Sequence, residues 1–149
     1  MGLIEKVPPG PVAIDTAIVI YLVERHERFL PLIRPLFAAA DEGKLQLVTS
    51  VITLLEVLVV PYRAGDSALA ARYEAVLSRS RGLDLVLIDL TLIRAAAQIR
   101  ATHGVRTPDS IQMAAGLARG CRSLLTNDRR LPSLPNLTVL QLGDYDARP

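Results

Sequence analysis

The sequence contains little sulfur and few aromatic rings. Its 149 residues include no tryptophan, one cysteine and two histidines, and only 4% are aromatic. Because Cys121 is the only cysteine, an intramolecular disulfide and any cysteine-based zinc site are excluded. His26 and His103 alone are too few to suggest zinc chemistry of another kind. The shortage of aromatic rings also argues against nucleic-acid binding that is dominated by base stacking.

Long apolar runs are also missing. The longest stretches, AIVIYLV at residues 17–23 and VITLLEVLVV at residues 51–60, are too short or too interrupted to span a bilayer. The opening segment MGLIEKVPPG lacks a signal-peptide pattern. We therefore expect a soluble, cytoplasmic protein with no membrane partner.

Apolar segments of two kinds alternate along the chain, and half of all residues are hydrophobic. Short β-type runs predict strands, and longer runs with helical spacing predict helices. Strands that alternate with helices indicate an α/β fold whose parallel sheet is covered on both faces. The predicted strands are 11–15, 45–50, 83–90, 121–128 and 137–142, and the predicted helices are 16–26, 29–43, 51–60, 66–81, 91–104 and 108–120.

Two aspartates directly follow predicted strands. Asp15 comes after the run PVAI, and Asp128 comes after SLLTN. The carboxyl ends of parallel strands meet at one edge of a sheet, where α/β proteins bind ligands, so these side chains should lie on the same edge. Capping of a helix or a turn is the commoner reason for aspartate at such places, and neither residue indicates a site by itself.

Glu56 is the only charged residue in the predicted helix 51–60, which is apolar nearly all round and is expected to be buried and to end before Pro61. A buried carboxylate needs a cation, a hydrogen-bond partner or a water-filled cavity. An ion pair with an arginine would satisfy it without any further function. Thr53, three residues earlier, lies on the same helical face and makes it locally polar.

Asp109 stands near the start of the predicted helix 108–120, where it could project into the same crevice. Four carboxylates from four segments would then converge. Like charges so close together repel one another unless a cation neutralises them. A hard divalent ion with oxygen ligands, Mg²⁺ or Mn²⁺, is the simplest solution.

Arginine dominates the positive charge around these acids. Of the 17 basic residues, all but Lys6 and Lys44 are arginine, and basic residues far outnumber acids between Arg94 and Arg130. A metal ion in such surroundings suits phosphodiester cleavage, because it can activate water, orient the phosphate and stabilise the leaving oxygen. A solvated arginine-rich surface without a function would produce the same pattern.

Four short segments occur in the order typical of one protein family. They are AIDTAIVIYL with Asp15 and Thr16, TSVITLLEVL with Ser50, Thr53 and Glu56, RTPDSIQMAAGL with Asp109, and LLTNDRRL with Thr126, Asn127 and Asp128. Through them the chain resembles the PIN domain and, within that family, the toxins of bacterial VapBC-type toxin–antitoxin pairs. The similarity extends from about Ala13 to Leu142.

The resemblance implies a three-layer α/β/α sandwich with a central parallel sheet, in a single PIN-like domain over residues 1–149 whose core is at about residues 12–142. It also implies a metal-dependent endoribonuclease, a homodimer, and a VapB-like antitoxin whose tail occupies the active-site groove. By matching positions, the catalytic and metal-binding residues would be Asp15, Glu56, Asp109 and Asp128, supported by Thr16, Thr126 and Asn127. The candidates for contacts with the RNA substrate are Arg106, Arg129 and Arg130.

The chain departs from the family pattern at two positions. Ala17 stands where an asparagine is frequent, and Arg130 stands where a second acid often follows. The first departure changes the surroundings of the site, and the second leaves Asp128 as the only candidate acid in its loop.

Other folds with acids at strand ends fit the sequence less well. A phosphoacceptor receiver domain would need a lysine at a late strand end, but the only lysines are Lys6 and Lys44. An aspartyl-phosphate hydrolase would need a second acid at the position of Ala17. The alternative from another class is a catalytically inactive PIN-fold module that binds RNA or protein.

Overall fold

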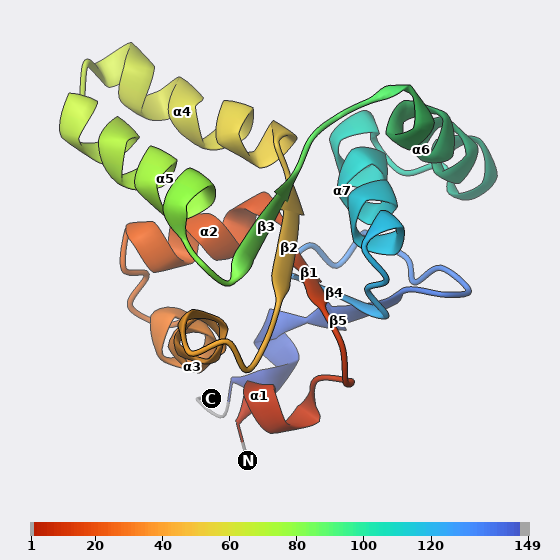
Figure 1. The fold of residues 1–149 in the computed structure, drawn as a ribbon, viewed down its shortest axis with the longest axis horizontal. Helices are drawn as coiled ribbons and strands as arrows, with labels where there is room; N and C mark the ends of the chain where they lie inside the picture. Colours follow the sequence, from red (N-terminus) through yellow and green to blue (C-terminus); the bar gives the residue numbers. More distant parts are fainter. Residues whose placement is uncertain (1, 147–149) are drawn as a thin grey trace.

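The computed structural model describes residues 2–146. Within that range the chain forms a five-stranded parallel sheet in the order β3-β2-β1-β4-β5, with helices on both faces (Figure 1). The strands are β1 Val12–Ile14, β2 Leu47–Ser50, β3 Leu83–Val86, β4 Ser123–Thr126 and β5 Thr138–Gln141. The predicted parallel α/β fold is confirmed.

The helices follow the predicted order, with two additions at the ends of the described range. Their bounds are α1 Leu3–Lys6, α2 Thr16–Val23, α3 Leu30–Asp41, α4 Ile52–Ala64, α5 Ser67–Arg79, α6 Leu90–His103, α7 Thr107–Ala118 and a 3₁₀ turn at Leu142–Tyr145. The sequence did not predict α1 or the 3₁₀ turn. None of the helices within residues 2–146 combines the length and the apolar character needed to cross a membrane.

Alternation along the strands divides the interior into two cores. Val12 and Ile14 face a core formed with α2 to α5, whereas Ala13 between them faces a core formed with α6 and α7. In β4, Leu125 belongs to the first core and Leu124 to the second. Successive side chains of a strand point to opposite faces, so each buried strand contributes to both cores. Figure 1 shows the resulting three layers.

Small residues allow α7 to pack closely against the sheet. A Cβ atom added to Gly116 would lie 3.0 Å from the Cβ of Ala13 on β1, and Ala114 and Ala115 beside it are buried. Because α7 runs across the face of the sheet from its start at Thr107, this close packing fixes where the first turn of the helix lies.

Helix α4 differs from its prediction in length and burial. It continues through Pro61 to Ala64 and ends where Gly65 adopts a left-handed conformation, with φ of 66°. The expectation that it is buried on all sides is wrong, since Leu55 and Val60 are 64% and 67% exposed. Figure 1 shows the reason: α4 extends beyond the carboxyl edge of the sheet and packs on α5, so only one of its faces is covered.

Candidate functional site

A cavity of about 410 Å³ lies at the carboxyl edge of the sheet, beyond β1 and β4. The structure places all four predicted acids around it. The other predicted residues that line it are Thr16, Asn127, Arg106, Arg129 and Arg130. Thr126 is fully buried behind this lining. Four segments far apart in sequence thus meet at one edge, as strand order and helix packing require.

Asp15 occupies the position between β1 and α2, where its backbone N–H donates to the carbonyl oxygen of Leu125 at 3.2 Å. Its side chain makes no regular capping hydrogen bond to α2, although the backbone N–H groups of Ala17 and Ile18 at the start of that helix act on the carboxylate and lower its pKa. The Thr126 hydroxyl donates to Oδ2, while Oδ1 is buried with no hydrogen-bond partner among the described residues. A buried acceptor without a partner is rare in folded proteins and calls for an explanation.

Burial raises the pKa of Asp15 to about 6, although the hydrogen bond from Thr126 acts in the opposite direction. The negative charge of Asp109 raises this pKa further. An ionised Asp15 is therefore costly unless a cation is close to it.

Thr126, the last residue of β4, joins two of the acidic segments. Its hydroxyl donates to Asp15 and accepts a hydrogen bond from the backbone N–H of Asp128 at 3.0 Å. The strand end therefore holds the Asp15 side chain and the start of the following loop in a fixed relation.

Arginine side chains bind the two acids on one side of the cavity. Nε and Nη2 of Arg130 each lie 3.0 Å from one oxygen of Asp128, and these hydrogen bonds lower the pKa of that carboxyl group. Nε of Arg106 donates to Oδ2 of Asp109 at 3.2 Å, and its Nη2 lies 3.9 Å from Asp128. Both carboxylates are therefore already neutralised by guanidinium groups.

Glu56 does not occupy the buried environment that the sequence suggested. Its side chain is exposed, because it projects from α4 where that helix extends past the sheet. Among the described residues it forms no ion pair, and its Oε1 accepts a hydrogen bond from the Thr16 hydroxyl at 2.6 Å. The arginine ion pair considered from the sequence is therefore not what holds this residue.

Within residues 2–146, no three His, Cys, Asp or Glu side chains form a cluster that could hold a metal ion. Asp15 nevertheless fits a hard cation, because its buried Oδ1 is an unpartnered anionic oxygen inside the cavity. The role of the acids as metal ligands stays a prediction.

Two residues that the sequence reasoning did not single out also line the cavity. The Tyr21 hydroxyl accepts a hydrogen bond from Nδ2 of Asn127 at 3.3 Å. Gln112 is on α7, three residues after Asp109 and therefore on the same helical face. That spacing was a usable signal for Gln112. Tyr21 gave none, because an aromatic ring in an apolar helix is usually part of a core.

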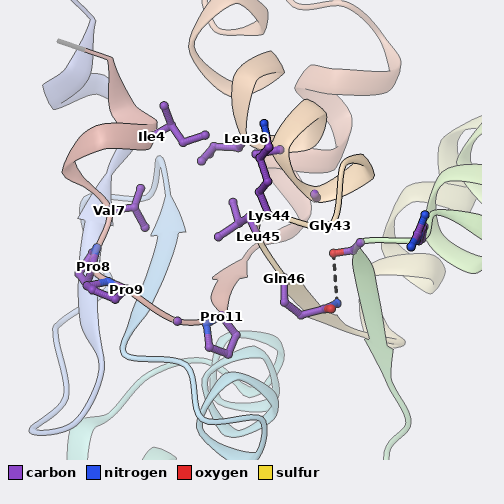
Figure 2. Close-up of a pocket in the computed structure, with 15 residues that line it drawn as sticks. Ile4, Val7, Pro8, Pro9, Pro11, Leu36, Gly43, Lys44, Leu45 and Gln46 are labelled. Carbon is purple, nitrogen blue, oxygen red and sulfur yellow. Dashed lines mark hydrogen bonds between the residues drawn. The ribbon is translucent and has the colours of Figure 1, made fainter.

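A larger cavity, of about 720 Å³, lies at the amino edge of the sheet. Figure 2 shows Val7 and Pro8 on one side of it and Leu45 and Gln46 on the other. No acidic side chain within residues 2–146 lines it. Its charged lining residues are Lys44 and Arg81, whereas the four predicted acids lie around the cavity at the opposite edge.

Comparisons with known proteins agree with this arrangement. The family described as PIN domain matches residues 12–137. A comparison with curated proteins gives no match.

Among solved structures, the chain is similar to VapBC2 from Rickettsia felis bound to a promoter DNA fragment, with a TM-score of 0.68, 16% identity, and coverage of 87% of this chain and 97% of that one. It is similar to DNA-bound VapBC from Salmonella typhimurium, with a TM-score of 0.63, 23% identity, and coverage of 89% and 98%. It is also similar to VapC20 from Mycobacterium tuberculosis, a toxin that cleaves the sarcin–ricin loop, with a TM-score of 0.61, 16% identity, and coverage of 76% and 86%.

Proposed function

Because this chain belongs to the PIN-domain family, we propose that it is a divalent-metal-dependent endoribonuclease of the VapC toxin type. The observation that carries the proposal is the cavity at the carboxyl edge, where four acids and three arginines from separate segments meet. Carboxylates beside arginines provide the two things that phosphodiester hydrolysis needs, a cation site and a phosphate site.

Asp15 is the residue most suited to bind the metal, with Asp109 the acid whose charge acts on it. Glu56 and Asp128 complete the proposed ligand set from the other two segments. When bound, Mg²⁺ or Mn²⁺ would supply an activated water molecule and stabilise the leaving oxygen. Thr126 orients Asp15 so that Oδ2 is occupied and Oδ1 is available.

The three arginines are proposed to bind the RNA backbone. Arg106, Arg129 and Arg130 line the cavity with side chains that are 63%, 62% and 73% exposed. A guanidinium group matches the geometry of phosphate oxygens, so these side chains can exchange a carboxylate for a substrate phosphate. Binding of RNA should accordingly weaken as the salt concentration rises.

We further propose that the protein assembles as a homodimer and binds a VapB-like antitoxin. The similar structures include toxin–antitoxin complexes, which supports a protein partner of this kind. The exposed apolar side chains of α4 and of the segment that leads into α6 offer surface for such contacts. The most exposed of them are Leu55, Val60, Tyr62, Leu87 and Leu90.

The second candidate is a PIN-fold module that binds RNA or protein without cleaving it. The ion pairs of Arg106 and Arg130 favour it, because they occupy two carboxylates that catalysis would need. Such a module would bind RNA through the same arginines but would gain nothing from a divalent metal.

One experiment separates the two candidates. Purified protein is incubated with a mixed pool of structured RNAs in Mn²⁺, in Mg²⁺ or in chelator, beside Asp15→Asn and the control Asp41→Asn, an exposed acid at the end of α3. The nuclease proposal expects metal-dependent cleavage by the wild type and by Asp41→Asn but not by Asp15→Asn. Titration with Mn²⁺ is performed on the same three proteins. RNA binding without cleavage and without Mn²⁺ binding would support the inactive module.

A further inference from the structure

A buried polar contact joins the two helices that carry Asp109 and Glu56. Gln112 lies one turn after Asp109 on α7, and Thr53 lies one turn before Glu56 on α4. Gln112 is only 5% exposed and Thr53 is fully buried. Polar side chains are rarely buried so completely unless their hydrogen bonds are satisfied.

The orientation of the Gln112 amide is fixed by the backbone of β2. Its Oε1 accepts a hydrogen bond from the backbone N–H of Ser50 at 3.0 Å, and a backbone N–H can only donate. Nε2 therefore points the other way, where it donates to the hydroxyl of Thr53 and lies 3.5 Å from that of Thr16.

Three threonine hydroxyls form a chain from this amide to Glu56. Thr49 and Thr53 are joined at 2.9 Å, Thr53 and Thr16 at 3.0 Å, and Thr16 and Glu56 at 2.6 Å. Each hydroxyl has one proton to donate and can accept from two directions. The direction of the chain therefore follows from counting protons.

The assignment of protons starts at Glu56, because an ionised carboxylate can only accept hydrogen bonds. Thr16 gives its single proton to Glu56, so the contact between Thr16 and Thr53 is made with the Thr53 proton. The Thr49 hydroxyl lies 2.9 Å from the Thr53 hydroxyl and donates to Oε1 of Gln112 at an oxygen–oxygen distance of 3.2 Å, so its single proton is shared between these two acceptors. Because Nε2 of Gln112 fills another acceptor position on Thr53, that hydroxyl is left to point its proton at Thr16.

We propose that Gln112 is a positioning residue of the active site: it clamps α7 to α4 through Thr53 and so supports the threonine chain through which Thr16 holds Glu56 over the cavity. The proposal rests on the proposed nuclease function. Glu56 is exposed, and without the chain its side chain would be free to turn into solvent.

The test uses two substitutions that break the chain at different points, Gln112→Met and Thr53→Val. Thr53→Ser keeps the hydroxyl and serves as the conservative variant. Ser123→Ala is the matched control, because Ser123 is a buried hydroxyl at the amino end of β4 with no hydrogen-bond partner among the described residues. The folded fraction of each protein is measured by chemical denaturation before any assay.

Two readouts follow. The first is kcat and KM for RNA cleavage in Mn²⁺, and the second is the carboxyl ¹³C resonance of Glu56 in protein with labelled glutamate, assigned by its loss in Glu56→Gln. We expect kcat to fall about tenfold to a hundredfold in Gln112→Met and Thr53→Val, as for a lost hydrogen bond to a charged group, with KM changed by less than about twofold. Thr53→Ser should restore kcat to within about threefold, and Ser123→Ala should match the wild type.

The Glu56 resonance should shift in the two chain-breaking variants and stay unchanged in Thr53→Ser and Ser123→Ala. The inference is overturned if the folded Gln112→Met and Thr53→Val proteins keep the wild-type kcat, or if their Glu56 resonance stays at its wild-type position. If the wild type itself does not cleave RNA, the nuclease proposal fails, and the resonance alone still decides whether Gln112 positions Glu56.

Discussion

Replacement of Asp15 by asparagine should stabilise the metal-free protein while it abolishes cleavage. Asparagine keeps the shape of the side chain and an acceptor for the Thr126 hydroxyl, but it removes the charge. Burial raises the pKa of Asp15 from 3.8 to about 6, so the ionised form is disfavoured in the folded state. A residue that destabilises the fold in this way is typical of a functional site.

The sign and the size of the expected stability change follow from the pKa of Asp15 in the unfolded and folded states. Because the folded pKa is above the unfolded one, the contribution of Asp15 to stability is fully present below pH 3.8 and is lost as the pH rises through about 6. This rise in the pKa means that the ionised Asp15 destabilises the folded state by about 3 kcal/mol at neutral pH. The asparagine amide forms a weaker bond with Thr126 than a carboxylate does, so a net gain of about 1–3 kcal/mol is expected for Asp15→Asn.

The assay is chemical denaturation in chelator at pH 3.5 and at pH 7.5, with Asp41→Asn as the control for a general change in charge. The free energy of unfolding of Asp15→Asn should equal that of the wild type at pH 3.5 and be larger at pH 7.5. Asp41→Asn should show no such increase. Added Mg²⁺ should then stabilise the wild type more than Asp15→Asn, because only a ligand of the folded state shifts the equilibrium. A variant that is less stable than the wild type at pH 7.5, or a difference independent of pH, would refute the reasoning.

Three further predictions concern other parts of the molecule. Arg130→Gln removes the guanidinium group that contacts both oxygens of Asp128, so the variant should bind Mn²⁺ more tightly than the wild type in a titration without RNA; unchanged affinity would show that this ion pair does not compete with metal. Gly82→Ala should lower the free energy of unfolding by at least about 2 kcal/mol, because a Cβ there would lie 2.3 Å from the carbonyl oxygen of Ala40, and a wild-type denaturation midpoint would contradict this. Burial raises the pKa of the Cys121 thiol to about 12, so a thiol reagent at pH 8 should modify it only after unfolding; fast reaction of the native protein would be the contrary result.

The order of strands and helices was predictable because it depends on local patterns. Alternating apolar runs gave the parallel sheet, and the aspartates after β1 and β4 were placed at one edge by a general property of such sheets. Helix α4 was predicted with the correct type and the wrong surroundings. Its apolar composition indicates burial only if some other element covers it, and within residues 2–146 its outer face is left open.

The partners of the acids could not be predicted in the same way. The sequence suggested an ion pair between Glu56 and an arginine, but in the structure Glu56 accepts a hydrogen bond from Thr16. The arginines instead form ion pairs with Asp109 and Asp128. Gln112 illustrates the same limit. Its spacing from Asp109 was visible, whereas its contact with Thr53 joins helices that are more than fifty residues apart in sequence.

The sequence by itself determined the PIN-like arrangement, the edge of the sheet where the site lies and the acids that surround it. The α/β order and the shared edge of Asp15 and Asp128 follow from periodicity and from the positions of these residues after strands, which are local properties of the chain, and the PIN-like arrangement with its other two acids follows from the resemblance of four short segments. Only the tertiary structure decided which oxygen of Asp15 lacks a partner, which arginine binds which carboxylate and how a buried amide reaches Glu56. Hydrogen bonds depend on distances of a few tenths of an ångström between segments far apart in sequence, and the packing of α4 and α7 on the sheet sets those distances.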